Sequence, residues 1–292
     1  MFFQQLANGL AIGSIYSLAA VGYSMVYGVL GLINFANNAF MIGGAYLLIL
    51  FFVWKGLPLW ITVILAAVLC GVGAMIMEGV SLRYIRNIGS SDISALICTV
   101  GYSTVIINLE ILIFGSQTNP VPSLFHFDMI TIGNVMLDPM QLIILGMAVI
   151  MMIILSYITY RTKTGVAMRA ISQNTQAAYL MGIKVNNIIN LTFFIGTVCT
   201  AVAGIMIGTY YGAVDTGMAF SIGIKTFAAA VLGGIGSLPG AMVGGIVVGI
   251  IETFIVSYVS AGYRDAIAFI ILIVVLVVRP SGLFGKKPIM KV

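Results

Sequence analysis

Charged side chains are scarce in this sequence, which has only 13 lysines and arginines and 8 aspartates and glutamates among 292 residues, or 7% of the chain. A soluble globular domain has about 25% charged residues. A folded surface needs such charges to stay in water, and this chain has too few to cover one. The scarcity excludes a soluble enzyme, a disordered tail and a charged coiled coil.

The residue types that build metal sites and disulfide frameworks are also rare. His126 is the single histidine, and the three cysteines, Cys70, Cys98 and Cys199, are isolated inside apolar runs. Without a CxxC or Cys/His cluster, neither a zinc site nor a disulfide framework is expected. There is no phosphate-binding loop, no carboxylate pair at a fixed spacing and no Ser-His-Asp set. We therefore expect a protein that is not an enzyme and has no cofactor or metal of its own.

Apolar sequence is abundant instead, with 61% hydrophobic residues and a mean hydropathy of +1.16. A helix that spans a bilayer needs about 20 apolar residues, and runs of this kind recur along the whole chain. They predict an all-α polytopic membrane protein with a single transmembrane domain over residues 1–292. The expected spans are 5–29, 37–54, 59–82, 93–114, 140–160, 187–212, 240–260 and 262–279, with a shorter apolar piece at 222–234.

The basic residues indicate the orientation, because ten of the 13 gather in three places. These are the connection after the third span, the loop 161–187 and the C-terminal tail. Lysine and arginine in short loops mark the cytoplasmic side. The ten residues are Arg83, Arg86, Arg161, Lys163, Arg169, Lys184, Arg279, Lys286, Lys287 and Lys291. The C-terminus is then cytoplasmic and the polar loop 115–139 is external, with a small hairpin expected around Gly133 and Asn134.

The number of crossings follows from this orientation. An even number must separate the cytoplasmic loop 161–187 from the cytoplasmic tail, but only three long spans lie between them. The short piece at 222–234 is therefore expected to cross as well. Of eight to ten possible crossings, nine are favoured, and the N-terminus lies outside.

Two apolar segments are interrupted in a similar way, near 31–38 and 233–240. Each begins Val-Leu-Gly, passes through a polar or proline-bearing stretch and ends in Gly-Gly, and the starts lie 202 residues apart. Glycine and proline free backbone groups that protein or water must satisfy inside a membrane. Paired breaks of this kind point to a transport pathway. Close packing of helices through small residues is the alternative.

Polar side chains within the spans are candidates to line such a pathway. Glu252 is the clearest, because it lies about midway along 240–260 and ionisable groups inside a membrane are commonly functional. The alternatives for Glu252 are a place near the outer interface or pairing with a neighbouring helix, and for the others hydrogen bonding between helices. The candidates are Tyr16, Asn34, Asn37, Asn38, Gly236, Ser237, Pro239 and Glu252.

The loop 161–187 is expected to form two short helices. The first covers about 165–171, and the second begins at an N-cap, Asn174, and ends at Gly182. An apolar face held in water needs a surface to pack on, either this protein's own helix ends or a groove on a partner. That face consists of Ala177, Ala178, Leu180 and Met181.

The same loop carries a resemblance. Its pattern is Gly165-x-Ala167-Met168-Arg169-Ala170-x-Ser172-Gln173-Asn174-x-x-Ala177-Ala178-x-Leu180-x-Gly182-Ile183, and it resembles the coupling loop of ABC importer permeases for branched-chain amino acids. Four further motifs resemble that family in order: Gly9-x-x-x-Gly13-Ser14-x-Tyr16-x-Leu18, Tyr27-Gly28-x-x-Gly31-x-x-Asn34-Phe35-Ala36, Leu232-Gly233-Gly234-x-Gly236-Ser237-x-Pro239-Gly240-Ala241 and Arg279-Pro280-x-Gly282-Leu283-x-Gly285. The resemblance covers nearly the whole chain and is nearer to the shorter, LivH-like members.

The resemblance implies a permease subunit that translocates amino acids, in particular leucine, isoleucine and valine, across the cytoplasmic membrane of a prokaryote by alternating access. It implies a heterodimer with a second permease, two ATPase subunits that bind ATP-Mg, and an extracytoplasmic substrate-binding protein. No nucleic-acid partner is expected, since the net charge of +5 mainly encodes orientation. The ATPase subunits would dock on Gly165, Met168, Arg169, Ala170, Gln173, Asn174, Ala177, Ala178, Leu180 and Gly182.

One departure from the family keeps other substrates open. The family pattern after Asn34-Phe35-Ala36 is usually His-Gly, where this sequence has Asn37-Asn38. A permease for urea or amides is therefore an alternative, as are an ion-coupled secondary transporter of small polar solutes and a channel or scaffold without pumping. The exposed helix pair and the scarcity of buried carboxylates favour the ABC permease.

Overall fold

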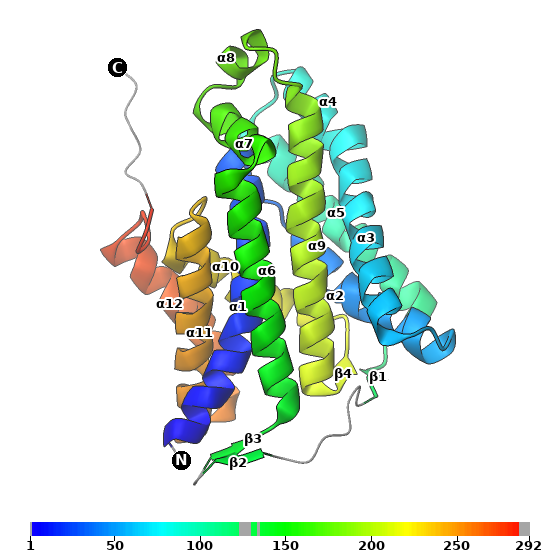
Figure 1. Cartoon of the computed structure of the whole chain (residues 1–292), viewed down its shortest axis with the longest axis vertical. Coiled ribbons are helices and arrows are strands. Elements are labelled where there is room, and N and C mark those ends of the chain that lie inside the picture. The colour runs from blue at the N-terminus through cyan, green and yellow to red at the C-terminus, as the bar shows by residue number, and fades with distance from the viewer. Residues whose placement is uncertain (1, 123–129, 133–134, 286–292) are drawn as a thin grey trace.

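The computed structural model describes residues 2–122, 130–132 and 135–285, and these form a bundle of helices that run mostly along one long axis (Figure 1). Eight of the described helices are long and apolar enough to cross a membrane. They are α1 (Phe2–Leu30), α2 with η1 (Ala36–Leu48, Ile49–Trp54), α3 with η2 and α4 (Leu59–Met77, Glu78–Leu82, Arg83–Asn87), α5 (Asp92–Phe114), α6 (Pro139–Arg161), α9 (Val185–Tyr211), α11 (Leu238–Tyr258) and η3 with α12 (Ala261–Tyr263, Arg264–Val278). The all-α polytopic fold is confirmed.

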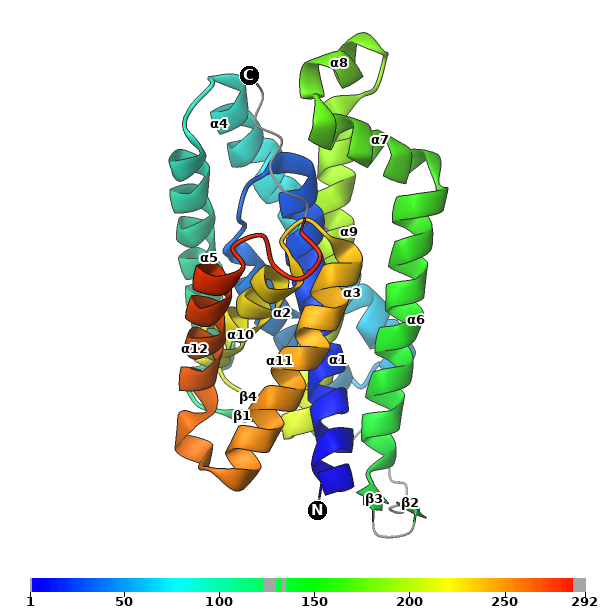
Figure 2. The ribbon, with the colours of Figure 1, turned by 90° about the vertical axis from the view of Figure 1, so that its left-hand side faces the viewer.

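A ninth, shorter apolar helix, α10 (Met218–Gly233), covers the piece expected at 222–234. It begins shortly after the two-residue strand β4 (Ala213–Val214), which pairs antiparallel with β1 (Asn119–Pro120). The N-terminal end of α1 and these strands lie at one end of the molecule, and α10 runs from that end towards the end that carries α7 and α8 (Figures 1 and 2). The structure thus has eight described helices of spanning length and α10 in addition, and the crossing by α10 that the parity of the basic loops requires stays a prediction.

The two helices of the basic loop are α7 (Lys163–Gln173) and α8 (Thr175–Leu180), at one tip of the bundle (Figure 2). The backbone N–H of Ala177 donates to Asn174 Oδ1 over 3.0 Å, so Asn174 is the N-cap of α8. Gly182 follows the end of α8, and its φ of +81° is a conformation that favours glycine. Both predictions are confirmed, and α7 extends two residues beyond 165–171 at each end, since Thr162 caps it through the N–H of Gly165.

The hairpin expected in the loop 115–139 is also present. Strands β2 (Ile130–Ile132) and β3 (Val135–Leu137) pair antiparallel, while the predicted turn at 133–134 and His126 lie outside the described residues. Gln4 joins this hairpin to α1. Its side-chain amide donates to the carbonyl oxygen of Met136 at 2.7 Å and accepts from the N–H of Met136 at 2.8 Å.

Helix α1 lies in the centre of the bundle, buried along most of its length and packed on α9 and α11. Glycines bring α1 and α11 into backbone contact: a Cβ placed on Gly249 would lie 2.3 Å from the Cα of Gly13, too close for any side chain. The Ser17 hydroxyl donates to the carbonyl oxygen of Met242 at 2.6 Å across the same contact. The motif that begins Gly9-x-x-x-Gly13 is therefore a packing motif, as small residues often are between membrane helices.

Candidate functional site

The first helix break lies between α1 and α2. Helix α1 ends at Leu30, Gly31 has φ +72°, and α2 begins at Ala36. The break expected near 31–38 is present, but Asn37 and Asn38 lie in the first turn of α2 and not in the interruption itself.

The three asparagines in and after this break are engaged with the protein. Asn34 Oδ1 accepts from the N–H of Ala36 at 3.1 Å, and Asn37 Oδ1 accepts from the hydroxyl of Thr200 on α9 at 3.1 Å. Asn38 accepts a hydrogen bond from the hydroxyl of Tyr23 on α1. Asn37 and Asn38 thus connect α2 to α9 and α1. This is the hydrogen bonding between helices that was the alternative to a role in lining a pathway. The amide nitrogens of Asn34 and Asn37 have no partner among the described residues.

The second break lies between α10 and α11, where Gly234 and Gly236 have φ +102° and +88°. The Ser237 hydroxyl caps α11 by accepting from the N–H of Gly240 at 3.3 Å, and Pro239 is the second residue of the helix, a position that proline tolerates. A Cβ on Gly240 would lie 2.2 Å from the carbonyl oxygen of Gly233, so the two helices meet backbone to backbone.

The segment after α12 packs on this second break. The N–H of Leu283 donates to the carbonyl oxygen of Leu232 at 2.8 Å, and that of Phe284 to Gly233 at 3.0 Å. The last carbonyls of a helix lack partners within the helix, so these two bonds satisfy the end of α10. Two motifs that lie about 50 residues apart in the sequence thus form one structural unit.

Both breaks open on one cavity of about 930 Å³ at the end of the molecule that carries α7. Helix α7 forms one wall, and the end of α1, the second break and the segment after α12 form the others. Its lining includes Tyr27, Gly28, Gly31, Met168, Arg169, Ser172, Gln173, Gly236, Ser237 and Phe284. A displacement of α7 would therefore change the walls of the space into which both breaks open.

The inner side of α7 and α8 is firmly seated on the bundle. A Cβ on Gly165 would lie 2.1 Å from the carbonyl oxygen of Thr159 at the end of α6, and Met168 is buried. Arg169 donates to that same carbonyl and lies 5.8 Å from the ring centre of Tyr160. These contacts fasten α7 to the end of α6.

The outer side of α8 is largely exposed. Leu180 and Met181 are each 83% exposed, whereas Ala178 is buried. The expected apolar face is thus divided, since neighbouring residues of a helix point about 100° apart. Ala178 packs inwards, while Ala177, Leu180 and Met181 are exposed.

Glu252 lies away from this cavity in an ion-pair network with a neighbouring helix, and Tyr16 lies beside it. Glu252 and Lys225 are 2% and 3% exposed, and their Oε1 and Nζ atoms are 3.0 Å apart. Lys225 also lies 2.9 Å from Asp265 Oδ1, and Arg264 Nε lies 3.3 Å from Glu252 Oε1. Lys225 is absent from the sequence-based candidates, although a lysine inside an apolar segment was a signal that could have identified it.

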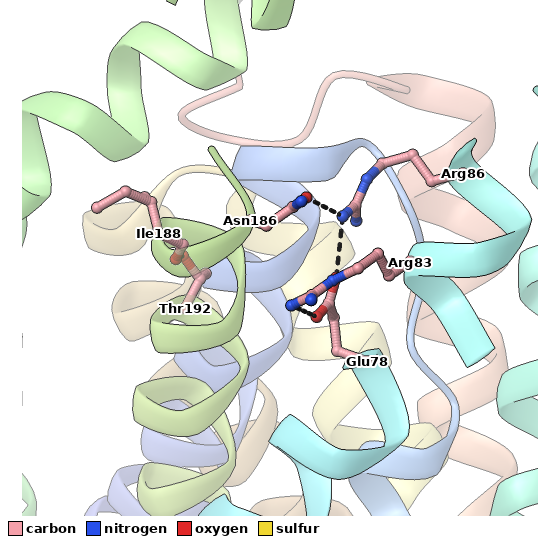
Figure 3. Close-up of polar contacts among 6 residues, drawn as sticks. All are labelled: Glu78, Arg83, Arg86, Asn186, Ile188 and Thr192. Carbon is pink, nitrogen blue, oxygen red and sulfur yellow. Dashed lines mark hydrogen bonds and ion pairs between the residues drawn. The ribbon is translucent and has the colours of Figure 1, made fainter. Parts of the chain in front are cut away.

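A second ion cluster lies at the end of the molecule that carries α7 and α8 (Figure 3). Glu78 is buried at the start of the π-helical turn η2 and accepts from Arg83 at 3.3 Å and from Arg86 at 3.0 Å. Arg86 also donates to Asn186 Oδ1 at 2.9 Å, in the first turn of α9, and Ile188 and Thr192 follow further along that helix. The cluster connects the end of α3 to the start of α9, directly after α8.

Replacing Glu78 by glutamine should lower the thermal unfolding midpoint of the purified protein. The substitution leaves two partly buried arginines without their countercharge, which costs about 1–3 kcal/mol. Differential scanning fluorimetry in detergent measures the unfolding midpoint. Arg86→Gln should cost less, because Glu78 keeps Arg83. An unchanged midpoint for Glu78→Gln would show that the cluster contributes nothing to stability.

Comparison with known proteins agrees with this architecture. The family described as branched-chain amino acid transport system, permease component, matches residues 5–276. The high-affinity branched-chain amino acid transport permease BraD of Pseudomonas aeruginosa is 39% identical over all of this chain and 98% of its own length. LivH of Escherichia coli K12 is 37% identical with the same coverage, and a probable LivH of Methanocaldococcus jannaschii is 26% identical over 96% of this chain and 91% of its own.

A solved structure, PsaBC from Streptococcus pneumoniae in complex with Fab, shares the fold. Its TM-score is 0.56 at 18% identity, with 95% of this chain and 92% of that chain covered. The family match over residues 5–276 and the relatives at 37% and 39% identity settle the classification. The chain belongs to the family of permease components of branched-chain amino acid transport systems.

Proposed function

We propose that this chain is the transmembrane permease subunit of an ABC importer that moves branched-chain amino acids into the cell. The observation that carries the proposal is the position of α7. This helix forms a wall of the cavity on which both helix breaks open, and the chain continues from it into α8, whose end is exposed. Relatives named for branched-chain amino acid transport, matched over their full length, support the substrate class.

The proposed orientation puts α7 and α8 in the cytoplasm and the N-terminus outside. Arg83, Arg86, Arg161 and Lys163 lie at the end with α7, which the positive-inside rule assigns to the cytoplasm. Two ATPase subunits that bind ATP-Mg would dock there, with a second permease beside this chain in a heterodimer. An extracytoplasmic binding protein would deliver the amino acid at the opposite end.

The mechanism follows from how α7 is held. ATP binding in the partner subunits would displace the exposed residues of α8. Because Gly165 and Met168 are packed on the bundle, α7 and the end of α6 would move together. The walls of the cavity would then separate or close around the residues of both breaks. Interactions that differ between the two states would bias alternating access.

Uptake by the complete transporter in proteoliposomes tests this function. With ATP inside and the binding protein outside, labelled leucine should enter only when ATP is hydrolysed, and unlabelled isoleucine and valine should compete. Uptake driven by an ion gradient without ATP would contradict the ABC mechanism. Transport of urea or an amide in place of leucine would contradict the substrate class and favour a role for Asn37 and Asn38 in selecting another solute.

A further inference from the structure

We propose that Tyr16, Lys225 and Glu252 form a binding site for the zwitterionic ammonium and carboxylate groups of an α-amino acid. The site lies apart from the cavity beside α7, and the proposal rests on the proposed function, because it assumes that the solute is an amino acid. It identifies which residues of this chain recognise the part that all α-amino acids share.

Three helices bring these residues together in the interior. Tyr16 comes from α1, Lys225 from α10 and Glu252 from α11, and each side chain is at least 97% buried. Lys225 Nζ lies 3.0 Å from Glu252 Oε1, and the Tyr16 hydroxyl lies beside the Glu252 carboxylate. A positive group, a negative group and a hydroxyl are therefore adjacent in the interior, with Asp265 and Arg264 completing the network.

The hydrogen-bonding capacity of this group is not used up. Glu252 Oε2 and the Tyr16 hydroxyl are both buried without a hydrogen-bond partner of ordinary geometry among the described residues. Lys225 has three N–H donors and two carboxylate neighbours, Glu252 and Asp265. Buried polar atoms are nearly always hydrogen-bonded in native proteins, so unpaired atoms side by side suggest a place for a ligand.

An amino-acid zwitterion complements these atoms in both charge and donor pattern. Its ammonium can donate to Glu252 Oε2 and to the Tyr16 hydroxyl oxygen, and its carboxylate can accept from Lys225 and from Arg264. Hydrogen bonds between ionised groups are the strong ones. The network already pairs two cations with two anions, so a neutral zwitterion leaves its charge balanced, whereas a simple amine or acid would bury an uncompensated charge.

Two members of the network reach the surface. Arg264 and Asp265 are 41% and 61% exposed at the start of α12, and Arg264 lies 5.6 Å from the ring centre of Tyr211 at the end of α9. These residues lie at the end of the molecule remote from α7 (Figure 2). Charged side chains thus lead from the proposed outer end to the buried atoms of Tyr16 and Glu252.

Tyr16→Phe tests the site in the reconstituted transporter. The substitution keeps the buried ring and removes only the hydroxyl, so the fold should be kept, but the bound ammonium loses one hydrogen bond. We expect leucine uptake per ATP hydrolysed to fall about tenfold, as expected for a hydrogen bond to a charged group. Tyr46→Phe is the matched control, since Tyr46 is also buried with an unpartnered hydroxyl, on α2.

Glu252→Gln provides a second measurement, because glutamine keeps the shape and an acceptor for Lys225 but loses the charge. Size-exclusion chromatography gives the amount of assembled complex. Leucine uptake divided by that amount should fall further than in Tyr16→Phe. Equal uptake by Tyr16→Phe and Tyr46→Phe would overturn the site, whatever Glu252→Gln does. If the wild-type transporter moves no amino acid, the proposed function fails instead, and that result is visible before any variant is compared.

Discussion

Replacing Leu180 by aspartate should abolish ATP-driven uptake while the permease stays folded in the membrane. Leu180 is 83% exposed at the end of α8 and touches little of its own chain, so a charge there costs the fold almost nothing. An apolar groove on the ATPase would have to bury that unpaired charge at a cost of several kcal/mol. Each 1.4 kcal/mol is about a tenfold change in affinity, so docking should weaken at least about 100-fold.

Co-purification of the ATPase subunits and leucine uptake measure this effect together. Ile88→Asp is the matched control, because Ile88 is 60% exposed and follows α4 at the same end of the molecule, outside α7 and α8. It should keep both docking and uptake. Ala178→Asp should behave differently from Leu180→Asp, since Ala178 is buried and a charge there disrupts the loop itself. Uptake retained by Leu180→Asp would refute docking on α8.

The spans were predictable because a bilayer fixes the length of a helix and leaves its backbone no partners outside the chain. The span expected at 93–114 is α5, Asp92–Phe114, within one residue. The span expected at 240–260 begins two residues earlier, at Leu238. In a sequence, a proline suggests that a helix is interrupted. Pro239 instead lies in the first turn of α11, where no helical hydrogen bond is lost.

The polar residues were harder to assign, because a sequence shows single side chains and not their partners. Asn37 and Asn38 indicated a pathway, and in the structure they form hydrogen bonds to Thr200 and Tyr23. Lys225 and Glu252 meet only because α10 and α11 turn back on each other through glycine contacts. The cavity beside α7 likewise depends on four segments that no local pattern brings together.

Replacing Gly249 by valine should remove most of the folded permease from the membrane. A Cβ at this position would lie 2.3 Å from both the N and the Cα of Gly13, so α1 and α11 would have to separate. Backbone atoms cannot move aside as a flexible side chain can, and overpacking of a tight core already costs about 1–3 kcal/mol. The loss should be at the upper end of this range or beyond, because α1 is the central helix. The yield of monodisperse protein in detergent measures this loss of folded permease.

The same substitution at Gly146 separates crowding from the effect of valine on a helix. Gly146 lies in α6, and a Cβ there would meet nothing within 4 Å. Valine and glycine are both weaker helix formers than alanine, so Gly146→Val should leave the yield nearly unchanged. Equal losses at both positions would show that the membrane bundle is sensitive to valine in general. A loss confined to Gly249 would show that the contact between α1 and α11 holds the three helices that carry Tyr16, Lys225 and Glu252 in register.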